Sequence, residues 1–101
     1  FRRVLFRSIE FCEVVSKTKL RVRVWERGAG VTLACGTGAC AVMVAARLHG
    51  LVSETAVLEL PGGNLEATWA GSASDAAHPV HLTGPTEKTF TGEWSLLLPM
   101  R

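Results

Sequence analysis

Residues Ala39 to Leu48 carry small or apolar side chains on every side, and no charge appears before Arg47. The segment predicts a helix, and no polar stripe marks a face that would meet solvent. A helix that is apolar all round is normally buried, so we expect other elements of the fold to enclose it. Gly50 follows this helix and is expected to form its left-handed C-terminal cap.

Alternating and β-branched segments supply the elements that would surround the helix. Between the predicted strands, Pro61-Gly62-Gly63-Asn64 suits a hairpin turn, and residues 70–78 are expected to form a surface loop. Together these patterns predict an α+β fold, a mixed or antiparallel sheet curled into a barrel around one central buried helix. Strands or short extended pieces are predicted over residues 9–15, 19–25, 31–34, 56–60, 65–69, 80–82 and 89–94.

The length of the chain fits one domain. The sequence has 101 residues, of which 48% are hydrophobic, enough for one core but too few for two ordinary domains. The first eight residues combine three arginines with two phenylalanines, yet they lack the apolar stretch and cleavage site of a signal peptide. We interpret residues 1–8 as a junction or scar outside the domain, and residues 9–101 as the domain itself.

Charge and cysteine content exclude several classes of partner. A net charge of +2 with no basic helical face gives no reason to expect nucleic acid or an anionic membrane as a partner. No run reaches the roughly 18 apolar residues that a membrane span needs. Three cysteines are too few and too unevenly spaced for a disulfide framework, which favours a reducing, cytoplasmic location.

Cys35 is the candidate reactive residue because it directly precedes Gly36-Thr37-Gly38 at the predicted start of the helix. The first backbone N–H groups of a helix lack intrahelical partners, and the helix dipole is positive there. Thiols in this position lose their proton at lower pH than a free thiol. The same N–H groups bind carboxylates. A base beside an anion cradle predicts chemistry at the carbon next to a carboxylate, with Thr37 or Cys35 as the helix cap.

The remaining candidate residues have simpler interpretations. Cys12 and Cys40 lie among apolar neighbours and are expected to be core cysteines. Cys40 follows Cys35 by five positions, roughly 140° round a helix, so the two thiols should not face one substrate. The three histidines show no metal-ligand spacing to one another or to a cysteine, and we expect no metal site.

Four blocks of sequence stand out, and they are Val24-Trp25-Glu26-Arg27-Gly28-Ala29-Gly30, Ala34-Cys35-Gly36-Thr37-Gly38-Ala39-Cys40-Ala41, Leu60-Pro61-Gly62-Gly63 and Thr83-Gly84-Pro85. In this order, the four blocks resemble the C-terminal domain of the diaminopimelate epimerase family. Position 31 is Val where many members carry Glu, and the chain is shorter than the two-domain members of the family.

This resemblance implies cofactor-independent epimerisation of LL-2,6-diaminopimelate to the meso form, a step of lysine biosynthesis. Two thiols exchange protons with opposite faces of the α-carbon, and Cys35 is expected to be one of them. The amides of Gly36 and Thr37 would bind the α-carboxylate of the substrate. Glu26 and Arg27 would hold its distal amino acid head. The second thiol belongs to the missing N-terminal domain, so this chain alone is expected to be inactive, and a homodimer is compatible with the sequence.

Two other functions remain open. The first is a related isomerase of the same fold, such as a proline racemase or a phenazine-pathway enzyme, which would need a distal pocket other than Glu26-Arg27. The second is a small-molecule binding module that keeps the carboxylate cradle without turnover. Supplying the missing domain would separate the epimerase from such a module.

Overall fold

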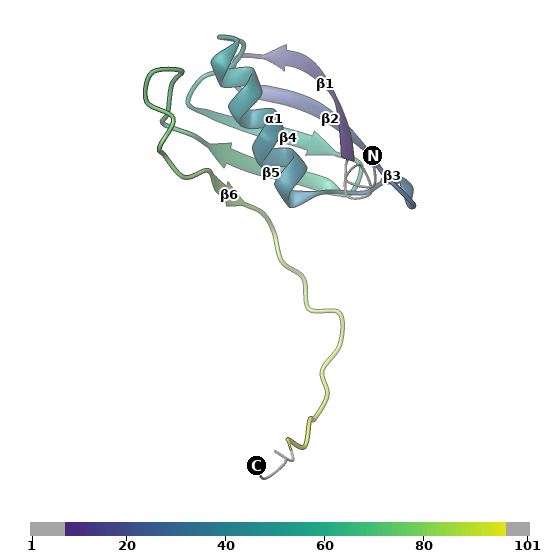
Figure 1. Cartoon of the computed structure of the whole chain (residues 1–101). Helices are drawn as coiled ribbons and strands as arrows, with labels where there is room; N and C mark the ends of the chain where they lie inside the picture. The colour runs from purple at the N-terminus through teal and green to yellow at the C-terminus, as the bar shows by residue number, and fades with distance from the viewer. Residues whose placement is uncertain (1–7, 97–101) are drawn as a thin grey trace.

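The computed structural model describes residues 8–96, which contain six strands and one helix (Figure 1). The interpretation of residues 1–8 as foreign to the domain concerns a segment that lies, except for Ser8, outside the described residues. No helix within residues 8–96 is long and apolar enough to cross a membrane. The elements are β1 (Ser8–Ser16), β2 (Lys19–Glu26), β3 (Gly30–Thr32), α1 (Gly36–Leu48), β4 (Thr55–Leu60), β5 (Gly63–Thr68) and β6 (His81–Thr83).

The strands form one mixed sheet in the order β1-β2-β4-β5-β6. All neighbouring pairs are antiparallel except β2 and β4, which run parallel because the chain passes through β3 and α1 between them. β3 pairs with the end of β2, where Val24 lies opposite Thr32. The predicted hairpin is confirmed, since Leu60 pairs with Gly63 across the turn Pro61-Gly62. The predicted surface loop is also present between β5 and β6.

α1 lies across one side of this sheet, which we call the inner face (Figure 1). The strand alternation places Leu20, Val22 and Val24 of β2 on the inner face, where each is almost fully buried. Apolar residues of α1, β4 and β5 complete a single core. The core residues are Leu20, Val22, Val24, Ala39, Val42, Met43, Ala46, Val52, Ala56, Leu58, Leu60, Ala67 and Trp69.

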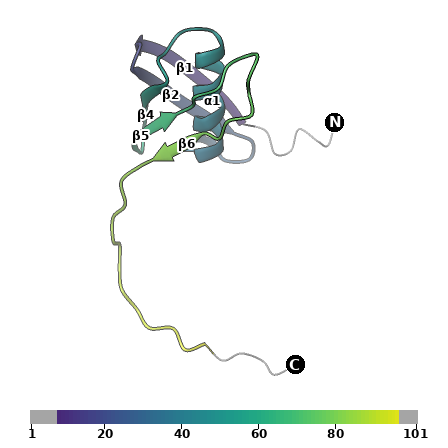
Figure 2. The ribbon, with the colours of Figure 1, turned by 90° about the vertical axis from the view of Figure 1, so that its left-hand side faces the viewer.

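The prediction of a barrel closed around a buried helix is wrong for this chain. The sheet remains open, and it covers only one side of α1 (Figure 2). Val42 and Met43 point to the sheet and are buried, whereas Ala41, Ala45 and Leu48 are exposed. The coarser prediction, an α+β fold with a mixed sheet and one helix, is confirmed. The sequence pattern showed that α1 has no polar face, but the described strands do not extend far enough to surround it.

The predicted strand over residues 89–94 is also absent. Residues 84–96 run away from the sheet in an extended conformation without pairing to any described strand (Figures 1 and 2). Phe90 and Trp94 are 83% and 85% exposed. Their residue types favour a strand, but a strand needs a hydrogen-bonding neighbour, and none lies beside this segment.

The C-terminal end of α1 closes with the cap that Gly50 predicts. Gly50 has φ +70°, its N–H donates to the carbonyl of Arg47, and the N–H of Leu51 donates to the carbonyl of Ala46. This double hydrogen bond is the Schellman motif, in which glycine occupies the left-handed position. Lys17 donates from Nζ to the carbonyl of Gly50 at 2.9 Å, which ties the β1–β2 turn to the end of the helix.

On the outer face of the sheet, which α1 does not cover, β2 exposes a row of basic residues. Glu59 of β4 accepts hydrogen bonds from Arg21 Nε and forms an ion pair with Lys19, both at 3.0 Å. The hydrogen bond from Arg21, followed by that from Lys19, lowers the pKa of the Glu59 carboxyl. Glu13 of β1 forms an ion pair with Arg21 from the other side. This row ties three neighbouring strands together in solvent.

Replacing Gly50 should destabilise the fold through the helix cap. Gly50→Ala places a Cβ at φ +70°, so we expect the free energy of unfolding to fall by about 1 kcal/mol, measured by urea denaturation. Gly92→Ala is the matched control, because a Cβ there meets nothing within 4 Å. An equal loss in both variants would contradict a specific role for the cap.

The Glu59 ion pairs should make stability depend on pH. The lowered pKa of Glu59 means that its contribution is present above the pKa of the unfolded chain and is lost as pH falls through the folded value. Glu59→Gln should therefore reduce stability at pH 7 and have little effect at pH 3, as followed by urea denaturation. Glu66→Gln, an exposed residue on the same face, should change stability little at either pH. A deficit for Glu59→Gln that is equal at both pH values would refute this account.

Candidate active site

Cys35 is the N-cap residue of α1, as one of the two alternatives from the sequence predicts. Its backbone is extended, with φ −146° and ψ 111°, and its sulfur accepts a hydrogen bond from the N–H of Gly38 at 3.4 Å. Thr37 Oγ1 lies 3.5 Å from the same sulfur. The helix begins at Gly36, so Gly36-Thr37-Gly38 forms its first turn rather than a turn before it. The Cys35 side chain is half-buried.

The first turn of α1 presents two free amide donors, those of Gly36 and Thr37, beside this sulfur. The N–H of Gly38 is engaged by Cys35 Sγ, and the N–H of Ala39 donates to the Cys35 carbonyl at 2.9 Å. Gly36 and Thr37 are exposed, and their N–H groups point out of the helix end, where the helix supplies no acceptor. Cys35, Gly36 and Thr37 therefore all lie at the N-terminal end of α1.

The hairpin turn between β4 and β5 contacts the chain just before Cys35. The N–H of Gly62 donates to the carbonyl of Leu33 at 2.9 Å. A Cβ at Gly62 would lie 3.0 Å from the Leu33 Cβ and 3.1 Å from the Leu33 carbonyl oxygen, so this approach is close. A small cavity of about 130 Å³ beside it is lined by Ala34, Gly62, Pro85 and neighbouring hairpin residues. Three of the four sequence blocks thus meet at the start of α1.

Glu26 and Arg27 occupy different environments. Glu26 ends β2 and is half-buried; its register places it on the inner face, opposite Ser8 of β1. Arg27 lies at the exposed β2–β3 turn, closed by a hydrogen bond from the N–H of Ala29 to the carbonyl of Glu26. Arg27 forms no ion pair with another residue of the 8–96 segment. The fold places Glu26 toward α1 and leaves Arg27 facing solvent.

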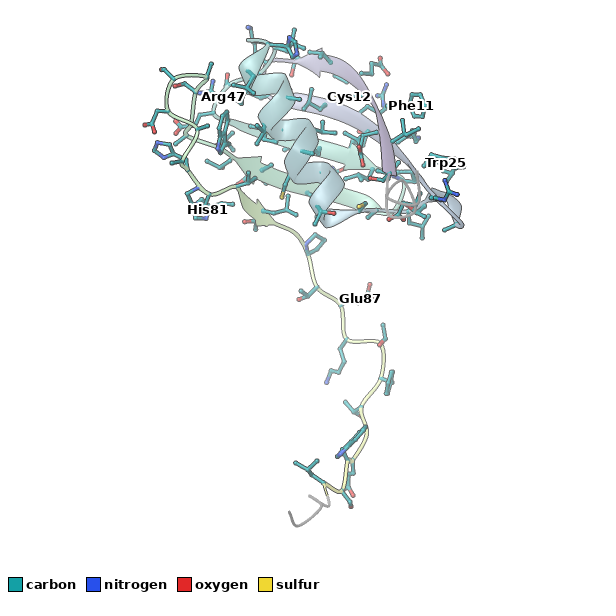
Figure 3. All side chains as sticks on the ribbon, in the orientation of Figure 1. Phe11, Cys12, Trp25, Arg47, His81 and Glu87 are labelled. Carbon is teal, nitrogen blue, oxygen red and sulfur yellow. The ribbon has the colours of Figure 1, made fainter. Side chains whose placement is uncertain are left out.

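The other two cysteines do not share the position of Cys35. Cys12 is exposed, so its interpretation as a core cysteine is wrong; it lies on β1, beside an apolar groove between that strand and α1 (Figure 3). Partial burial raises the pKa of the Cys12 thiol. Cys40 is half-buried within α1. Within residues 8–96, no group of three or more histidine, cysteine or acidic residues could hold a metal ion.

Sequence reasoning missed one residue near the site. Glu10 of β1 pairs with the buried Val24 of β2, so its side chain belongs to the inner face. Its carboxylate approaches Gly38 in the first turn of α1. The predicted strand over residues 9–15 contains Glu10, but its strand pattern alone does not single out this position. Alternate residues of a strand share one face of the sheet, and this pattern places the charged Glu10 in the same row as Cys12 and Val14. That alternation could have identified Glu10 from the sequence.

The site at this end of the sheet consists of the Cys35 thiol, the free amides of Gly36 and Thr37, and the Glu10 carboxylate. The amides can bind an anion such as a carboxylate, and the thiol can give or take a proton within the same region. Glu26, on the inner face, can accept hydrogen bonds from an ammonium group. This combination suits an α-amino acid whose α-carbon lies next to Cys35.

Known proteins are similar in sequence to this chain over most of its length. The family model for diaminopimelate epimerase matches residues 6–88. Diaminopimelate epimerase 1 from Nostoc sp. is 54% identical over 86 residues, which cover 85% of this chain and 29% of that protein. Diaminopimelate epimerase from Synechococcus sp. is 57% identical over 85 residues, covering 84% of this chain and 28% of the relative.

A plant relative shows the same pattern. The chloroplastic diaminopimelate epimerase of Oryza sativa subsp. japonica is 55% identical over 85 residues, covering 84% of this chain and 23% of the rice protein. The chain thus spans less than a third of the length of these relatives. Because the family model covers well over half of it, the chain belongs to the diaminopimelate epimerase family.

Proposed function

We propose that this chain is the part of a diaminopimelate epimerase that supplies one of two proton-transferring thiols. The observation that carries the proposal is the position of the Cys35 sulfur, half-exposed at the N-cap of α1 beside the free amides of Gly36 and Thr37. Helix stability alone favours serine, threonine, aspartate or asparagine as the N-cap residue. A cysteine there is better explained by proton transfer than by capping.

The proposed reaction moves one proton on each face of the substrate α-carbon. In one direction the Cys35 thiolate removes the α-proton, while a second thiol delivers a proton to the opposite face; the roles exchange in reverse. The amides of Gly36 and Thr37 bind the α-carboxylate, whose negative charge grows as the α-proton leaves. No cofactor takes part in this scheme. Glu26 and Arg27 are proposed to recognise the distal amino acid head of the substrate.

Residues of a longer parent are proposed to complete both the site and the fold. The relatives are more than three times as long as the matched segment, which leaves room for the second thiol in another domain. Within residues 8–96, the outer edge of β1 has no neighbouring strand. A groove of about 340 Å³ runs between β1 and α1, and Ala41 and Ala45 line it. We propose that the parent covers this groove, and that the whole enzyme works in the cytoplasm.

Cys35→Ser in the full-length parent should lower α-proton exchange by about 10²- to 10⁴-fold, because serine is a far weaker acid and base. Deuterium wash-in from solvent into diaminopimelate, followed by mass spectrometry, measures this loss. Cys40→Ser is the matched control and should retain most of the exchange, since Cys40 lies roughly 140° round the helix from Cys35. Wash-in at the parental rate in Cys35→Ser would reject the assignment.

The 101-residue chain alone should show no deuterium wash-in, since it lacks the second thiol of the proposed pair. The same assay, run with the full-length parent at equal concentration, provides the positive control. Exchange catalysed by the isolated chain and abolished by Cys35→Ser would show that one thiol is enough, and would overturn the two-thiol scheme.

A further inference from the structure

Glu10 is the one charged residue on the inner-face row of β1. The row also contains Ser8, Cys12 and Val14, and the last two line the apolar groove beside α1. Ser8 Oγ donates a hydrogen bond to Glu10 Oε1 at 2.5 Å. The carboxylate is therefore oriented by a neighbour on its own strand. A half-buried carboxylate in an apolar row needs a reason beyond packing.

Glu10 and Cys35 flank the same point on the first turn of α1. A Cβ at Gly38 would collide with the Glu10 carboxylate, whose Cδ would be 3.1 Å away, and would lie 3.3 Å from the Cys35 sulfur. A side chain at position 38 would therefore require the flexible Glu10 side chain to shift. Glycine at position 38 thus allows β1 to bring a negative charge close to the thiol.

The side-chain charges around this point are unbalanced in the described structure, since the N-terminus of α1 supplies only a partial positive charge. The first turn of α1 contains no acidic residue of its own, so Glu10 supplies the negative charge from β1. Glu26 lies on the same face, diagonally across from Glu10 in the β1–β2 register. Neither carboxylate forms an ion pair with another residue of 8–96, and the basic residues of β2 lie on the outer face. A cation from a ligand would balance this charge.

We propose that Glu10 is a specificity-determining residue that makes the surroundings of Cys35 selective for an ammonium group. The inference rests on the proposed function, because it places the amino group of an α-amino acid near Glu10. The carboxylate of the same amino acid head lies on the amides of Gly36 and Thr37. A zwitterionic head thus spans the first turn of α1, with its α-carbon facing the Cys35 sulfur.

Charged thiol reagents test this proposal directly on the isolated chain. Cys12→Ser and Cys40→Ala leave Cys35 as the only thiol, which reacts with a methanethiosulfonate to form a mixed disulfide and release methanesulfinate. The ratio of the reaction rates of the trimethylammonium-ethyl and sulfonato-ethyl reagents reports the electrostatic potential at Cys35. The fraction of Cys35 that is thiolate affects both rates equally and so cancels from the ratio. At low ionic strength, Glu10→Gln should lower this cation-to-anion ratio by about 3- to 10-fold.

Two variants and a salt series complete the experiment. Glu10→Asp should keep most of the ratio, and Glu66→Gln, on the outer face of β5, should leave it unchanged. Salt should lower the ratio in the chain with Glu10 intact, which tests the proposal even if Glu10→Gln does not fold. An unchanged ratio in Glu10→Gln, an equal fall in Glu66→Gln, or no salt effect would overturn it. None of these readouts needs turnover, so failure of the epimerase assignment is detected separately, by deuterium wash-in.

Discussion

The packing of α1 against the inner face of the sheet is the interaction on which the site depends. Val42, Met43 and Ala46 bury one side of the helix against β2, β4 and β5. This fixes the helix axis, and the first turn then projects at the end of the sheet where β2 and β3 pair. Cys35 cannot leave this place without loss of the helix cap and of the helix–sheet contact.

One short connection then aligns the residues before the helix. The Pro61-Gly62 turn reaches across to the Leu33 carbonyl, and the close approach admits no side chain at position 62 without a shift of Leu33. Segments far apart in sequence therefore hold the chain that delivers Cys35. The site is built on packed backbone at the end of a sheet, which holds a side chain in place better than a free loop would.

Several apolar side chains and one strand edge are exposed in the described residues. Between Thr37 and Arg47 the exposed residues of α1 are apolar, and two of them, Ala41 and Ala45, line the groove beside β1. Phe11 and Trp25 project from β1 and β2 on the side away from α1 (Figure 3), and both are exposed. The outer edge of β1 leaves backbone groups that another strand could pair with. These features are consistent with the small share of the relatives that the chain covers.

Local sequence determined most of the elements and the position of the Cys35 thiol. Alternation predicted β1, β2 and the hairpin, the glycine after α1 predicted its cap, and the position of Cys35 before Gly36-Thr37-Gly38 predicted an N-terminal thiol. These predictions succeed because backbone conformation, capping and strand alternation depend on neighbours within a few residues. The family resemblance added the substrate class, which no local pattern contains.

Only the tertiary structure decided how the sheet closes and which distant side chains meet. The apolar sides of α1 predicted enclosure, but enclosure requires strands that the described residues do not supply. Residues 89–94 have strand-like side chains and no partner, so they remain extended. Glu10 lies beside Cys35 because strand register and helix packing bring β1 to the first turn of α1. Register and packing are contacts between segments far apart in the chain, and local pattern does not encode them.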